Sequence, residues 1–125
     1  MTEGRVLLVE DDDDLRMTMA ALLREEGIKV ADVANGVEAL AWMHAHGRPA
    51  VILLDLMMPR MDGIQFRTAQ LAVPELADVP VVLMTASTVH QHLVETCGVD
   101  EVIRKPVEFE KLLGVVRRYC NRSSA

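Results

Sequence analysis

The stretch RVLLVEDDDDLR, residues 5–16, decides how the rest of the chain is interpreted. One arginine and four apolar residues are followed at once by five consecutive acids, Glu10 to Asp14. A short apolar run is typical of a buried strand, whereas a carboxylate resists burial unless a cation or hydrogen bonds compensate it. The stretch therefore predicts a buried strand that leaves the core at a cluster of carboxylates.

Length and composition limit the possible classes of protein. A chain of 125 residues that is 50% hydrophobic is the size of one ordinary domain, so we expect a single domain over residues 1–125. A net charge of -6 disfavours a nucleic-acid-binding surface. The start of the chain does not resemble a signal peptide, and no apolar run has the length of a membrane span. We therefore expect a cytoplasmic protein that binds neither nucleic acid nor a membrane.

Short apolar runs alternate with longer amphipathic stretches along the chain. The runs that predict strands are residues 6–9, 28–33, 51–54, 81–84 and 102–103. The stretches that predict helices begin after the acids of the opening segment and continue at 35–47, 61–72, 87–98 and 107–120, with Gly27 ending the first helix and a frayed polar tail at 121–125. This alternation is typical of an α/β domain with a parallel sheet.

Polar side chains gather where the predicted strands end. Glu10 and Asp11 follow the first strand, Asp55 the third, Thr85 the fourth and Lys105 the fifth. Because parallel strands have their carboxyl ends at the same edge of the sheet, we expect these side chains to meet there.

Three carboxylates at one edge would repel one another and raise at least one pKa unless a cation shared the site. Carboxylate oxygens suit Mg²⁺, whereas Zn²⁺ favours His or Cys, and neither stands at these strand ends. Asp12, Asp13 and Asp14 suit the first turn of the following helix, where the dipole favours negative charge. A simpler alternative remains open, in which the whole acidic run is a solvated, well-capped helix start.

Four motifs in order resemble the receiver domain of bacterial two-component response regulators over essentially the whole chain. They are LLVEDD at 7–12, VILLDLMMPRMDG at 51–63, VVLMTA at 81–86 and VIRKP at 102–106. The resemblance implies a flavodoxin-like, five-stranded parallel sheet of order 2-1-3-4-5 with five helices on both faces. It also implies a signalling protein that is no enzyme beyond catalysing its own phosphorylation and dephosphorylation.

The resemblance assigns a role to each site residue. Asp55 is implied to accept a phosphoryl group from a phosphohistidine of a sensor histidine kinase or histidine phosphotransfer protein. Glu10, Asp11, Asp55 and the backbone carbonyl of Met57 are implied to hold Mg²⁺. The implied contacts to the phosphoryl oxygens come from Lys105, the Thr85 hydroxyl and the backbone N–H of Ala86, with a cis peptide bond between Lys105 and Pro106.

In the family, phosphorylation alters a protein-binding face made by the fourth helix, fifth strand and fifth helix. An aromatic side chain three residues before the lysine takes part, but Val102 stands at that position here. We therefore expect the face to bind a downstream protein through a smaller shift. Because no output domain follows the fifth predicted helix, we favour a single-domain regulator, although a domain cut from a longer chain is the alternative.

Two other classes of protein compete with this interpretation. A phosphohydrolase of the haloacid-dehalogenase type needs a second aspartate two residues after the nucleophile, and position 57 is Met. A flavin carrier needs a phosphate-binding loop rich in Ser, Thr and Gly after the first strand, where this chain has EDDDD. Turnover of a phosphoester or a yellow protein would favour one or the other.

Overall fold

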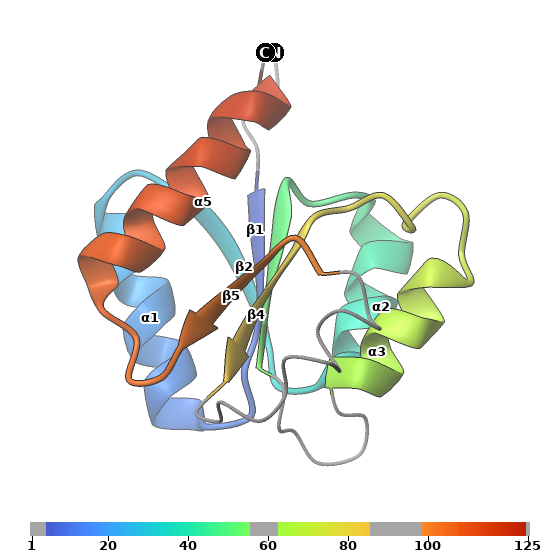
Figure 1. The fold of residues 1–125 in the computed structure, drawn as a ribbon, viewed down its shortest axis with the longest axis horizontal. Coiled ribbons are helices and arrows are strands. Elements are labelled where there is room, and N and C mark those ends of the chain that lie inside the picture. Colours follow the sequence, from blue (N-terminus) through green and yellow to red (C-terminus); the bar gives the residue numbers. More distant parts are fainter. Residues whose placement is uncertain (1–4, 56–62, 86–98, 125) are drawn as a thin grey trace.

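The computed structural model describes residues 5–55, 63–85 and 99–124, which form a parallel sheet with helices on both faces (Figure 1). The sheet has the order β2-β1-β3-β4-β5, which confirms the predicted flavodoxin-like topology. Its strands are β1 Arg5–Val9, β2 Lys29–Val33, β3 Val51–Asp55, β4 Val81–Thr85 and β5 Glu101–Arg104. The helices among the described residues are α1 Asp13–Glu25, α2 Gly36–His46, α3 Gly63–Leu71 and α5 Phe109–Ser124.

The apolar strands are buried because helices cover both faces of the sheet (Figure 1). Val6 and Leu8 of β1 belong to a core cluster with side chains of α1 and α5. Leu7 and Val9 alternate with them and belong to a second cluster with side chains of α2 and α3. Side chains of β3 and β4 divide between the two clusters in the same way, so the inner strands read as continuous apolar runs.

Local signals in the sequence set the ends of the first two helices. The Asp12 side chain accepts a hydrogen bond from the Leu15 N–H at 3.0 Å and caps α1. Asn35 caps α2 through the Glu38 N–H at 2.9 Å. After α1, Gly27 has φ +82°, a left-handed conformation that glycine adopts without strain and that turns the chain toward β2.

The strand register brings the ends of β1, β3 and β4 to one edge. Val9 pairs with Leu54, so the next residues, Glu10 and Asp55, leave the sheet side by side. Asp55 in turn pairs with Met84, and Thr85 follows directly. The predicted gathering of polar side chains at this edge is therefore a consequence of the register.

The structure corrects one prediction and leaves another outside the described residues. The tail at 121–125 was expected to fray, but α5 continues to Ser124, because extending a helix that tertiary packing already holds costs little. The helix predicted over 87–98 lies within residues 86–98, which are not described. Over the described ranges, we find no helix that is both long and apolar enough to cross a membrane.

Leu53 lies in the middle of β3 with none of its side chain exposed. We expect Leu53→Ala to lower the free energy of unfolding by about 3 kcal/mol, because it removes buried methyl groups and leaves a cavity. Urea unfolding followed by circular dichroism measures this change. Met17 on α1 is 63% exposed, so Met17→Ala serves as the control and should change the free energy by less than about 0.5 kcal/mol. Equal effects of the two variants would contradict the assignment of the core.

Candidate functional site

Three acids form a compact cluster at the carboxyl edge of the sheet. Glu10 and Asp55 are buried, with 1% and 4% of their surfaces exposed, whereas Asp11 is exposed. Each can offer one carboxylate oxygen such that these oxygens all lie within 4.8 Å of one another. The cluster therefore has a buried floor of two carboxylates and one side open to solvent.

Lys105 follows β5, and its ammonium group contacts this cluster. Its Nζ lies 3.3 Å from Asp55 Oδ1 and 3.3 Å from Glu10 Oε1. Its backbone N–H donates to the carbonyl of Thr85 at 2.9 Å, which ties the turn after β5 to the end of β4. The peptide bond between Lys105 and Pro106 is cis, as the resemblance implied.

The crowding changes the charge that Glu10 can carry. Burial, a hydrogen bond with the Asp55 side chain and repulsion by Asp55 together raise the pKa of Glu10 from 4.5 to about 7. The Asp12 N–H and the Lys105 ammonium oppose this increase but do not outweigh it. The direction agrees with the expectation that crowding raises the pKa of at least one acid, with burial as the larger cause.

The pKa of the Lys105 ammonium is raised as well, which favours its charged form. Partial burial works to lower its pKa, but the charges and hydrogen bonds of Asp55 and Glu10 outweigh that effect and raise the pKa above its usual value. Lys105 is therefore a permanent positive charge at neutral pH. Among the described residues, one ammonium group therefore faces three carboxyl groups at this site.

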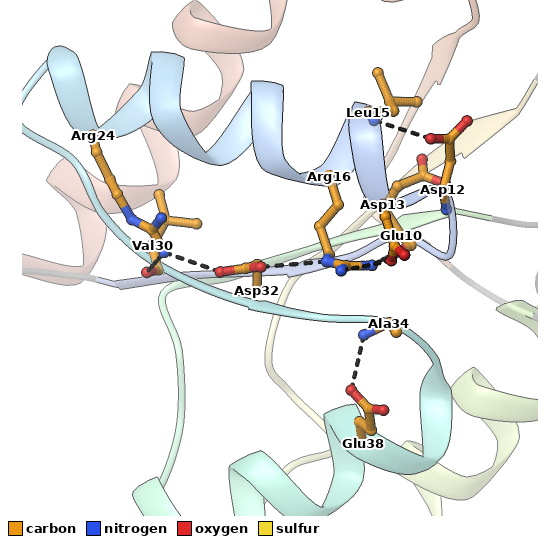
Figure 2. Close-up of polar contacts among 10 residues, drawn as sticks. All are labelled: Glu10, Asp12, Asp13, Leu15, Arg16, Arg24, Val30, Asp32, Ala34 and Glu38. Atoms are coloured by element: carbon orange, nitrogen blue, oxygen red, sulfur yellow. Dashed lines mark hydrogen bonds and ion pairs between the residues drawn. The ribbon is translucent and has the colours of Figure 1, made fainter.

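The turn after β1 holds Glu10 in place (Figure 2). The backbone N–H of Glu10 donates to the carbonyl of Val33 at 3.1 Å. Its Oε2 accepts from the N–H of Asp12 at 3.2 Å. Asp12 thus serves both as the cap of α1 and as a hydrogen-bond donor to the site, and the second of these contacts was not predicted from the sequence.

The structure brings together Glu10, Asp11, Asp55 and Lys105, and it places Thr85 at the same edge with 4% of its surface exposed. The predicted carbonyl of Met57 and N–H of Ala86 lie outside the described residues. Sequence reasoning also missed Arg16, whose guanidinium reaches the carbonyl of Glu10 at 3.0 Å. The helical pattern of the sequence places Arg16 on a polar face of the helix. It does not indicate which carbonyl of a neighbouring strand the side chain contacts.

The family model named Response regulator receiver domain matches residues 6–117, and the chain belongs to that family. Members of the family are signalling proteins. The chain is 35% identical over 124 residues to the transcriptional regulatory protein PrrA of Mycobacterium tuberculosis. That match covers 98% of this chain and 52% of PrrA, so the chain spans about half the length of this relative.

Solved structures agree with this assignment. The chemotaxis response regulator CheY4 of Vibrio cholerae superposes with a TM-score of 0.84 at 29% identity, over 94% of this chain and 99% of that one. The receiver domain of the sensor histidine kinase PA1611 from Pseudomonas aeruginosa superposes with a TM-score of 0.84 at 25% identity, over 96% of this chain and 99% of that one. That structure has a magnesium ion coordinated in its active site cleft.

The raised pKa of Glu10 predicts how stability depends on pH when a chelator removes divalent cations. Between pH 4.5 and about pH 7 the unfolded chain ionises Glu10 more readily than the folded protein does, so the free energy of unfolding falls as the pH rises. Glu10→Gln removes this loss. We expect the variant to match the wild type near pH 4.5 and to exceed it at pH 8, by roughly 1–3 kcal/mol.

Urea unfolding at a series of pH values measures this difference. Glu75→Gln is the matched control, because Glu75 is an exposed acid that lies away from the carboxylate cluster. A Glu10→Gln variant that is less stable than the wild type at pH 8 in chelator would contradict this account of the cluster.

Proposed function

We propose that Asp55 accepts a phosphoryl group from the phosphohistidine of a sensor histidine kinase or histidine phosphotransfer protein, in a reaction that depends on Mg²⁺. The observation that carries this proposal is the position of the Asp55 carboxylate, which lies beside two other acids and 3.3 Å from a lysine ammonium. Membership of the receiver family supports it. We further propose that residues 1–125 together form this one domain.

The donor set of the cluster fits Mg²⁺. Its three groups are all carboxylates, and the exposed side at Asp11 leaves room for the waters that Mg²⁺ retains. The three oxygens lie within 4.8 Å of one another, so they would be able to reach one small cation. Glu10, Asp11 and Asp55 hold the ion in this proposal, with the carbonyl of Met57 as a further ligand carried over from the family.

The reaction is an attack by a carboxylate oxygen of Asp55 on phosphorus. The new O–P bond forms as the P–N bond to the imidazole breaks, and that electron pair stays on the imidazole, which leaves as a neutral ring when its other nitrogen carries a proton. A bound Mg²⁺ neutralises charge that develops on the phosphoryl oxygens. Water later attacks the acyl phosphate and releases inorganic phosphate, so the chain acts only on itself.

Two residues at the edge of the sheet would contact oxygens of the phosphoryl group on Asp55. Lys105 already contacts Asp55 and supplies a positive charge for one phosphoryl oxygen. Thr85 follows Met84, the register partner of Asp55, and supplies a hydroxyl donor for another. The N–H of Ala86 is the third donor that the family pattern implies.

Phosphorylation of Asp55 would alter the surface made by β5 and α5. Lys105 directly follows β5, and Arg118 of α5 pairs with Glu101 at the start of that strand. Val102 is 38% exposed on β5, and a short β-branched side chain has no ring that can rotate between exposed and buried positions. We therefore propose that the face of β5 and α5 binds a downstream protein through a small backbone shift, together with the helix expected over residues 87–98, which lie outside the described residues.

Intact-mass spectrometry after incubation with acetyl phosphate tests the phosphoacceptor. We expect one phosphoryl adduct with Mg²⁺ and none with a chelator, because the crowded carboxylates otherwise repel the donor. Asp55→Asn and the double variant Glu10→Gln, Asp11→Asn should both lose the adduct. Asp14→Asn is the control, because Asp14 is an exposed acid in the first turn of α1 and should keep it. An adduct that survives in Asp55→Asn would refute the proposal.

The backbone amide spectrum before and after phosphorylation tests the binding face. We expect the amide signals of β5 and α5 to shift, because the new negative charge attracts the ammonium group of Lys105. Lys105 directly follows β5 in the chain, so its movement would displace that strand. The amides of α2 lie on the other face of the sheet and should change less (Figure 1). Unchanged β5 and α5 amides in a fully phosphorylated sample would show that another face carries the signal.

A further inference from the structure

One guanidinium connects three segments beside the acidic cluster. Arg16 of α1 donates through Nη1 to the carbonyl of Glu10 at 3.0 Å and through Nε to Asp32 Oδ2 at 3.3 Å. Its Nη2 lies 2.7 Å from Asp13 Oδ1. Figure 2 shows the side chain reaching from the first turns of α1 to the end of β1 and to β2. Only 14% of the Arg16 side chain is exposed, whereas its partner Asp13 is 75% exposed, so the contacts with Asp32 and the Glu10 carbonyl are the more sheltered ones.

The contact with the Glu10 carbonyl bears directly on the site. A peptide group is planar, so the carbonyl of Glu10 and the N–H of Asp11 turn together. That peptide joins the two acids from the first strand end that take part in the cluster. Whatever holds the carbonyl therefore sets how the Glu10 and Asp11 side chains leave the backbone relative to each other.

The partners of Arg16 make it a rigid support. Asp32 lies next to Val33 in β2, and Val33 accepts the hydrogen bond from the N–H of Glu10. Arg16 and β2 thus hold the two sides of Glu10, since one contacts its carbonyl and the other its N–H. Arginine suits this task because its donors diverge from one planar group, whereas a lysine ammonium has a single nitrogen.

We infer that Arg16 is a positioning residue for the metal-binding acids: by fixing the peptide between Glu10 and Asp11 against β2, it sets the geometry in which both carboxylates reach one Mg²⁺. This inference rests on the proposed Mg²⁺ site. Arg16 contacts the backbone of Glu10 and, among the described residues, hydrogen-bonds to none of the three clustered carboxylates, so we expect it to affect the affinity for Mg²⁺ and not the transfer step.

The sign of the effect separates positioning from simple electrostatics. A positive charge near the cluster disfavours a divalent cation, so its removal would strengthen Mg²⁺ binding if charge alone mattered. Arg16 is paired with two carboxylates, however, which cancels much of its field. Positioning predicts weaker Mg²⁺ binding without Arg16, and it predicts weaker binding even in Arg16→Lys, which keeps the charge.

Calorimetric titration with MgCl₂ provides the test, with Arg24→Lys as the matched control. Arg24 lies on the same helix and contacts the same Asp32, at 3.0 Å, but it also donates to the carbonyl of Val30 and not to that of Glu10. Loss of a residue that orients metal ligands typically costs 10–100-fold in affinity, so we expect Arg16→Lys to bind Mg²⁺ about tenfold more weakly than Arg24→Lys. Arg16→Ala should be at least as weak.

A second readout distinguishes positioning from general damage to the fold. The rate of phosphorylation by acetyl phosphate in Arg16→Lys should approach the wild-type rate once Mg²⁺ is saturating, with only the half-saturating concentration raised. Less than a threefold difference between the affinities of Arg16→Lys and Arg24→Lys, tighter binding by Arg16→Ala, or a rate that stays low at saturation would overturn the inference. If the wild type itself binds no Mg²⁺, the proposed function fails and the inference fails with it.

Discussion

The structure depends on a balance between three carboxylates and one ammonium group at the edge of the sheet. Glu10 and Asp55 are buried where solvation of two negative charges is poor, and Lys105 lies 3.3 Å from both. Burial and the neighbouring Asp55 raise the pKa of Glu10 to about 7, and the opposing effect of Lys105 does not outweigh them. Perturbed pKa values of this kind cluster at functional sites, and the proposed Mg²⁺ would compensate the crowded carboxylates.

The surrounding fold provides the rigidity that this arrangement needs. Both faces of the inner strands are packed, so the ends of β1 and β3 have little freedom to move apart. The register of β1 with β3 places Glu10 and Asp55 side by side, and Arg16 and Asp12 hold the turn between the strand and α1. Packing sets the positions of the backbone at the site, and local hydrogen bonds set the orientation of its acids.

Much of this arrangement could be predicted from the sequence. The change from VLLV to EDDDD marked both a buried strand and the edge of the core, and parallel topology then implied that Asp55, Thr85 and Lys105 lie at the same edge. These inferences succeeded because a short run of residues is enough to show that a strand is buried. The direction of the parallel strands then determines the edge at which they end. The hydrogen bond from Arg16 to the Glu10 carbonyl could not be predicted, since it depends on how α1 packs against the end of a strand. The extension of α5 to Ser124 was missed for a similar reason, because polar residues say little about where a packed helix ends.

The central claim is that these acids form one site for a divalent cation, and paramagnetic broadening by Mn²⁺ tests it most directly. Mn²⁺ shares the preference of Mg²⁺ for oxygen ligands, and its broadening of amide signals falls steeply with distance. At substoichiometric Mn²⁺, the amide signals of Glu10, Asp11 and Asp55 should be lost selectively. The signals of Lys29 and Val51, which lie at the far ends of β2 and β3, should persist. Broadening centred elsewhere, or no broadening of the Asp55 amide, would contradict the central claim.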